Sequence, residues 1–250
     1  MSVHTLLLGV VAGFVAGGDS WTGLVIGLAI GALVLPITGA VSVWSHPKLG
    51  PKAKRRAAVL MLVFAALGLL SLLHGPAVPL VFLGAVGAAL GGAYALSRKV
   101  TGPRSTPTEL IAIACLSLIA PMGWLLIAGN GPRVWLSGPL AFLAFGGTVP
   151  YIRVRVRRRR FKTMTLAERI RGGWLALAWQ AVAVAGSVAL AASVVVTWLV
   201  PAAFTPGAIK TTLGIATPER RPQIKHMGYL ETAISTVFAV LAGFGLGLAP

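Results

Sequence analysis

The carboxylates of this chain are few enough to be weighed one at a time for chemistry. Its 250 residues include only five Asp and Glu. Four stand where helices are expected to begin, a place where a carboxylate interacts favourably with free backbone N–H groups. These four are Asp19, Glu109, Glu168 and Glu219. Glu231 differs because an apolar stretch begins directly after it.

Two short patterns predict helix starts in detail. Residues 106–109 read Thr-Pro-Thr-Glu and residues 165–168 read Thr-Leu-Ala-Glu. In such a capping box the Thr hydroxyl accepts a hydrogen bond from the third residue, and the Glu reaches back to the Thr backbone. Residues 217–219, Thr-Pro-Glu, predict a third start. Asp19 is expected to cap the helix that follows it.

Two interpretations of Glu231 stay open. An ionisable group inside an apolar segment is costly and usually faces the bundle interior with a partner. Glu231 can reach the membrane surface and meet a loop cation such as Lys225, or it can belong to a buried ligand or proton site. Gln180 and Tyr94 are polar groups within apolar stretches, and a transport site needs both of them in one cavity with Glu231. Hydrogen bonding between helices is the commoner use of such groups.

The most basic segment of the chain extends from residue 153 to residue 162. Its basic residues are Arg153, Arg155, Arg157, Arg158, Arg159, Arg160 and Lys162. The simpler interpretation is that they orient the chain and bind anionic lipid headgroups, at about 1 kcal/mol per basic residue near the surface. Lys52, Lys54, Arg55, Arg56, Arg159, Arg160 and Lys162 are assigned this lipid and topology role.

A second interpretation concerns the first four arginines of that segment. Arg153, Arg155, Arg157 and Arg158 are candidate ligands for a small anionic molecule such as a diphosphate. A guanidinium group suits that role because it binds phosphate through two parallel hydrogen bonds. Aromatic residues are nearly absent from the segment, with only Phe161 nearby, so a nucleic-acid partner is not expected.

The remaining metal-ligating residue types do not gather in the sequence. His4, His46, His74 and His226 stand at the ends of four different segments, and Cys115 is the single cysteine. No two histidines are three or four residues apart, the spacing that places two ligands on one helix face. Neither a metal nor another cofactor is predicted.

Composition identifies the surroundings of these residues. Of the chain, 56% is hydrophobic and 11% is charged, and the mean hydropathy is +0.86, whereas soluble domains carry roughly 25% charged residues. Apolar stretches of about 20 residues, each long enough to cross a hydrocarbon core, recur from end to end. We expect one all-α integral membrane domain over residues 1–250, with about nine spans. These are placed at 4–17, 22–44, 56–75, 77–97, 108–128, 134–153, 171–186, 188–206 and 227–248.

The basic residues predict the orientation. All Lys and Arg except Arg133 lie in four segments: 45–56, 98–107, 153–171 and the stretch from Lys210 to Lys225. Basic loops face the cytoplasm, which predicts that the N-terminus lies inside and the C-terminus outside. The four segments share a side only if 172–206 crosses twice or enters and returns, turning near Gly186 and Ser187. The alternative is a single long tilted helix and eight spans.

Small residues recur at four-residue spacing in three stretches, which predicts close helix packing there. They are Gly9, Gly13 and Gly17; Gly23, Gly27 and Gly31; and Gly84, Ala88 and Gly92.

Three stretches resemble a known family. ELIAIACLSLIAP at 109–121, VPYIRVRVR at 149–157 and GYLETAISTVF at 228–238 are similar to the middle and the last helix of YwiC-like bacterial membrane proteins. The chain departs from that family at its start, where an acidic-His-Gly-aromatic stretch is usual and His4 stands alone. The resemblance implies a multi-pass protein of the bacterial cytoplasmic (inner) membrane and leaves the activity open.

The expected layout also resembles that of UbiA prenyltransferases. Those enzymes carry Asp-rich motifs after the second and sixth spans, where they hold Mg²⁺ and a prenyl diphosphate. Here the same places, 45–56 and 153–162, hold no carboxylate, and Mg²⁺ needs oxygen ligands. Metal-assisted prenyl transfer is therefore not expected.

The function expected from the sequence is non-enzymatic. The chain is predicted to bind or move a hydrophobic or anionic small molecule, or to accompany a respiratory complex, with anionic lipid headgroups around it. The alternative is a metal-independent enzyme on a UbiA-like scaffold that acts on an isoprenoid or a lipid headgroup.

Overall fold

The computed structural model describes residues 2–44, 50–102, 105–158, 165–217 and 224–249. These residues form eleven helical elements and no strand, which confirms the all-α prediction. The elements are α1 (Ser2–Val15), α2 (Trp21–Trp44), α3 (Pro51–His74), α4 (Ala77–Thr101), α5 (Thr106–Ser117), α6 (Ile119–Ala128), α7 (Val134–Gly146), α8 (Thr148–Arg158), α9 (Leu166–Ala192), α10 (Leu199–Ala216) and α11 (Ile224–Gly247).

Several helices are long and apolar enough to cross a membrane. Within the described residues, five stretches meet this criterion by length and composition: Pro51–His74, Ala77–Thr101, Thr106–Ala128, Leu166–Ala192 and His226–Gly247. In α3 and α4 only 11% of the most apolar window is buried by the protein itself. Apolar surface of this extent is stable only when another apolar medium covers it. The chain is therefore a multi-pass protein embedded in a membrane.

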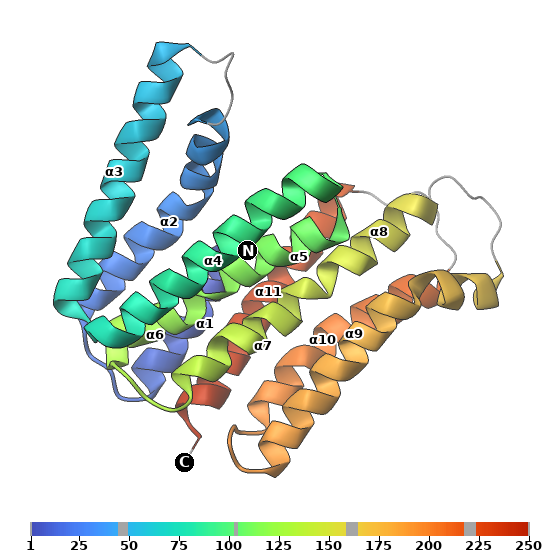
Figure 1. The fold of residues 1–250 in the computed structure, drawn as a ribbon. Helices are drawn as coiled ribbons and strands as arrows, with labels where there is room; N and C mark the ends of the chain where they lie inside the picture. The colour runs from blue at the N-terminus through green and yellow to red at the C-terminus, as the bar shows by residue number, and fades with distance from the viewer. Residues whose placement is uncertain (1, 45–49, 103–104, 159–164, 218–223, 250) are drawn as a thin grey trace.

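The centre of the bundle is built on α1, which lies between α6 and α11 (Figure 1). Small residues allow this approach. A side chain added at Gly9 would meet the backbone carbonyl of Ala120, and one added at Gly243 would meet Val11. Hairpin α2–α3 leans away on one flank, and hairpin α9–α10 lies on the other flank beside α7 and α8 (Figure 1).

Two of the long rods are broken near their middles. Elements α5 and α6 are separated at Leu118, and α7 and α8 at Gly147. Pro121 explains the first break, because it has no N–H to donate to the carbonyl of Ser117. At the second break, Trp179 of α9 donates its indole N–H to the Leu143 carbonyl at 2.7 Å. A side chain inserted into the helical hydrogen-bond ladder is a recognised cause of a kink.

The stretch 172–206 forms two helices, but the predicted turn position is wrong. Helix α9 continues through Gly186 and Ser187 to Ala192, and the turn occupies residues 193–198. Ser187 is compatible with the helix because its buried hydroxyl donates to the Val184 carbonyl at 2.8 Å. Residues 194–196 are three consecutive valines, which are poor helix formers. The single long helix over 172–206 is also wrong.

Several other boundaries differ from the prediction: parts of the expected loops 45–56, 98–107 and 153–171 belong to α3, α4 and α9, and two differences bear on the site. The segment expected as a basic loop from residue 153 is helical to Arg158, as α8. Lys210, expected in a loop, lies inside α10. In both cases a helix continues past the end of the apolar run, because the basic residues bond to other parts of the protein, as described below.

The helix caps follow the prediction in one case. Thr165 and Glu168 form the predicted capping box, whereas the cap of α5 is Ser105, one residue earlier than expected. Before α2 the hydroxyl of Ser20, rather than Asp19, accepts the backbone N–H of Gly23. Residues 218–219, part of the third predicted start, lie outside the described residues.

The third stripe of small residues does not pack as predicted. Positions corresponding to Cβ of Gly84 and Gly92 face open space, whereas Gly9, Gly13 and Gly23 lie directly against α6. Spacing alone does not distinguish a stripe that meets a helix from one that faces the membrane.

Candidate functional site

An ion pair lies between the last two helices of the bundle. Lys210 Nζ of α10 donates to Glu231 Oε1 of α11 at 2.6 Å. The two side chains are 10% and 22% exposed, respectively. The partner of Glu231 is thus a cation on a helix. Lys225, the loop cation suggested by the sequence, has no described side chain.

Tyr151 of α8 covers the lysine of this pair. Lys210 Nζ lies 4.9 Å from the centre of the Tyr151 ring, a cation–π contact. The tyrosine is buried, and its hydroxyl lies so close to α10 that a side chain at Gly214 would collide with it. Because Gly214 has no side chain, Tyr151 of α8 can pack directly against α10 beside the ion pair.

A small cavity of about 30 Å³ adjoins the pair. Four helices contribute its polar groups, and aromatic rings bound it on another side. The polar lining residues are Thr148, Gln180, Lys210, Glu231 and Ser235, and the aromatic ones are Phe145, Phe204 and Phe238. The Phe238 ring centre lies 5.0 Å from that of Phe204 and 5.8 Å from that of Phe145.

Gln180 is the most informative residue of the cavity. Its side chain is only 9% exposed, and within the described part of the chain no hydrogen bond to its amide is found. The amide lies between Gly147 and Gly207, where side chains would approach it to 2.9 and 3.8 Å, respectively. The amide atoms are not fully enclosed and border the cavity, so a water molecule or another polar group there can supply the hydrogen bond that buried amides nearly always have.

The broken helix α7–α8 borders the same cavity. Gly146 and Gly147 lie against the Trp179 ring, and side chains there would collide with it. The Thr148 hydroxyl donates to the Phe145 carbonyl at 2.6 Å, which satisfies one acceptor near the break. Broken helices beside a polar cavity are typical of membrane transport sites.

The two arginines of α8 whose side chains the structure describes, Arg153 and Arg155, bond to the protein itself. Arg153 donates Nε and Nη2 to Glu109 Oε2 at 3.2 and 3.1 Å, respectively. Arg155 donates Nη1 to the carbonyl of Gly214 at 3.1 Å. Arg169 of α9 similarly donates to the Ala216 carbonyl at 2.8 Å. Cations that bond to the last carbonyls of a helix stabilise its C-terminus, so Arg155 and Arg169 together cap α10.

The other predicted site residues are distributed as follows. The structure describes the backbone of Arg157 and Arg158, in α8, but not their side chains. Arg159, Arg160 and Lys162 lie outside the described residues. Tyr94, on α4, does not line the cavity, so the condition set from the sequence for a transport site, that all three polar groups share one cavity, is met by Gln180 and Glu231 only. Lys52, Arg55 and Arg56 line a separate pocket on α3, and Lys54 does not.

Sequence reasoning missed Lys210, Tyr151, Thr148 and Ser235 as members of the site. Lys210 had a usable signal, because it lies nine residues from the nearest other cationic or acidic residue along the chain, Glu219. Among the described residues, no three His, Cys, Asp or Glu side chains come together in a way that could hold a metal ion.

No family model matches this chain, and neither the curated proteins nor the solved structures contain a match.

Proposed function

We propose that this chain is a nine-span membrane protein of the YwiC-like type that binds and moves a small anionic molecule. The binding site in this proposal is the cavity between α7, α8, α9, α10 and α11. The proposal includes a bacterial inner-membrane location, the N-terminus inside and the C-terminus outside.

The arrangement of helix ends supports the proposed topology. Six helix ends next to the basic segments lie toward one end of the bundle: Pro51, Thr101, Arg158, Leu166, Ala216 and Ile224 (Figure 1). Helices α1 and α11 are parallel, since Val11 lies against Gly243 and Val15 against Gly247. If each helix crosses the membrane once, with α5–α6 and α7–α8 each counted as one, the positive-inside rule places the N-terminus inside and the C-terminus outside.

The single observation that carries the proposed activity is the unbonded Gln180 amide beside a buried ion pair. Lys210 supplies positive charge, and the Gln180 amide supplies donors with no partner in the described chain. An anion could take the place of Glu231 on Lys210 while accepting from Gln180. Charge-assisted hydrogen bonds of this kind are the stronger ones in proteins.

The cavity must open for this exchange. At about 30 Å³ it has room only for a very small number of water molecules. The break at Gly147 gives α7–α8 a point at which its halves can change angle. Movement of that rod away from α9 would expose Gln180 and the ion pair together, because both border it.

The enzyme alternative has less support. It needs the arginines of α8 for a diphosphate, yet Arg153 and Arg155 already bond to Glu109 and to the Gly214 carbonyl. Their release would leave Glu109 without its cation and α10 with Arg169 as its remaining cap.

The test is native mass spectrometry of the protein purified in mild detergent. A small anion should co-purify with the wild type and be reduced about tenfold in Gln180→Leu, the loss expected for one or two hydrogen bonds. Thr211→Val is the control, because Thr211 is also buried and its hydroxyl has no partner among the described residues, but it does not line the cavity. Equal retention by both variants would contradict the proposal.

A further inference from the structure

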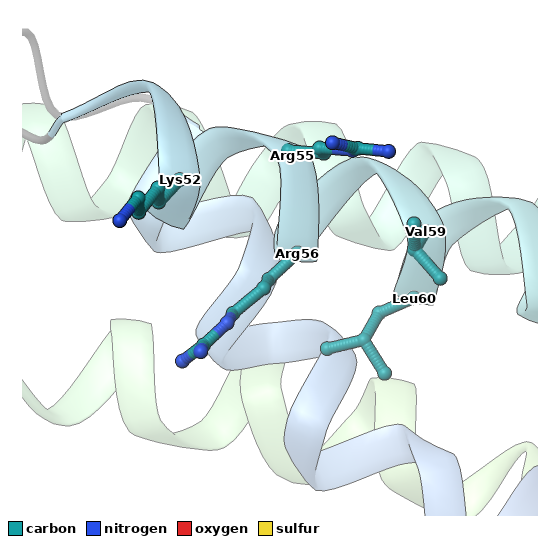
Figure 2. A pocket seen from close by; sticks show the side chains of 5 residues that line it. All are labelled: Lys52, Arg55, Arg56, Val59 and Leu60. Atoms are coloured by element: carbon teal, nitrogen blue, oxygen red, sulfur yellow. The ribbon is translucent and has the colours of Figure 1, made fainter.

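A second, larger pocket lies on α3, a helix that contributes nothing to the cavity described above. Its volume is about 520 Å³, and it is lined by Lys52, Arg55, Arg56, Val59 and Leu60. Figure 2 shows Lys52 and Arg56 extending to the same side of the helix, with Leu60 one turn further along. The pocket therefore combines a cationic part with an aliphatic part.

The sequence spacing places these residues on one stripe of α3. Relative to Lys52, the others lie three, four, seven and eight residues later, which is the repeat of a single helix face. At about 1.5 Å per residue, Val59 is roughly 10 Å further along the axis than Lys52. Cations thus occupy the first two turns, and aliphatic side chains occupy the next.

The positive charge of this pocket is not neutralised by the described protein. Lys52, Arg55 and Arg56 are exposed, and none forms an ion pair or a hydrogen bond through its side chain within the described residues. No Asp or Glu occurs anywhere between Asp19 and Glu109. Elsewhere, Glu109 and Glu231 are already paired with Arg153 and Lys210. The counter-charge must come largely from outside the chain.

The rest of α3 indicates what supplies that charge. Its most apolar part is only 11% buried by the protein, so this helix faces lipid beyond the pocket. Val59 is 53% exposed there. A free phosphate would use the cations but would leave the aliphatic wall uncovered. A phospholipid satisfies both parts, with its phosphate on the cations and an acyl chain over Val59 and Leu60.

We propose that this pocket binds the headgroup of an anionic phospholipid, with its phosphate between Lys52 and Arg56, whose side chains extend to the same side of α3 (Figure 2). Arginine holds phosphate oxygens through paired N–H donors, and lysine adds a point charge. This site is independent of the proposed transport function, because it lies on another helix and has no residue in common with the cavity.

The test uses the full-length protein in detergent with phosphatidylglycerol or phosphatidylcholine added, followed by native mass spectrometry. The variant is Lys52→Gln combined with Arg56→Gln. Lys54→Gln is the matched control, because it removes a charge from the same turn but does not line the pocket. Wild type and control should retain phosphatidylglycerol in preference to phosphatidylcholine, and the double variant should bind it about 30-fold more weakly.

Three outcomes would overturn the proposal. The first is retention of phosphatidylglycerol by the double variant, and the second is an equal loss in Lys54→Gln. The third is displacement of the lipid by an excess of inorganic phosphate, which would assign the site to a soluble anion. Unchanged thermal unfolding of the lipid-free variants verifies that they are folded. Arg56→Gln alone gives a second measurement if the double variant is poorly made.

Discussion

The cations at the end of α8 and those at the start of α3 are the same residue types at the same end of the bundle, but their surroundings differ. Arg153 and Arg155 bond to a carboxylate and to a helix carbonyl of the protein. Lys52, Arg55 and Arg56 have no such partners among the described residues and line an open pocket. A basic cluster can thus hold a fold together or remain available to a ligand, and packing around it decides which.

The two sides of the bundle also differ in how tightly their helices pack. The α9–α10 flank contacts α8 and α11 through an ion pair, a cap and glycines that fit against side chains. On the other flank, Gly84 and Gly92 face open space and α3 is little buried. Substitutions on the first flank should therefore alter stability, and substitutions on the second should alter lipid contacts.

The largest expected effect is at the buried pair. Glu231→Ala leaves Lys210 charged and without its partner, which should lower the free energy of unfolding by about 3 kcal/mol. Lys210→Met combined with Glu231→Leu should recover most of that loss, since no buried charge remains. Thermal unfolding in detergent measures both. A single variant as stable as the wild type would show that the pair is not buried.

A glycine substitution compares the packing of the two flanks. Gly214→Ala places a methyl group against the Tyr151 hydroxyl and should destabilise by about 2 kcal/mol through overpacking. Gly84→Ala meets nothing within 4 Å, so the better helix propensity of alanine should make it neutral or stabilising, by at most about 1 kcal/mol. Unfolding in the same detergent provides the measurement. The reverse order would contradict the packing described for α8 and α10.

A smaller effect separates the two groups of cations directly. Arg153→Ala removes an ion pair whose side chains are 31% and 38% exposed, so we expect a loss of at most about 1 kcal/mol. Arg55→Ala removes no bond within the described protein, and its stability without lipid should stay within about 0.5 kcal/mol of the wild type. If the two variants lose the same stability, the contrast between α8 and α3 does not hold.

Much of the fold was predictable because length and apolarity alone require membrane helices. The sequence also predicted that 172–206 forms two segments, because the basic segments before and after it share one side of the membrane only if it crosses twice or returns. It did not predict the turn, because glycine and serine in a membrane helix are tolerated when neighbours satisfy the backbone. The continuation of α8 to Arg158 was not predicted either. It is stabilised by hydrogen bonds from Arg153 to Glu109 and from Arg155 to the Gly214 carbonyl, and both partners are distant along the chain.

The candidate site was only partly predictable. Glu231 and Gln180 were identified as polar groups in apolar segments, and they line one cavity. Tyr94 carried the same signal but lies on α4, outside it. Lys210 was missed because it was grouped with loop cations, and its pairing with Glu231 follows from the antiparallel packing of α10 on α11. Whether the cavity residues and the arginines bind a ligand stays a prediction.

Access to the cavity tests the central claim most directly. In a Cys115→Ala background, which removes the single cysteine, Ser235→Cys places a thiol on the cavity wall. Membrane vesicles are treated with small thiol reagents, one anionic and one cationic. We expect the anionic reagent to react faster, and to slow markedly when Lys210 is changed to Met. Thr236→Cys, on the next residue and outside the cavity lining, should not show this dependence. A Ser235→Cys thiol that the anionic reagent never reaches, or reaches equally without Lys210, would contradict a site that admits anions.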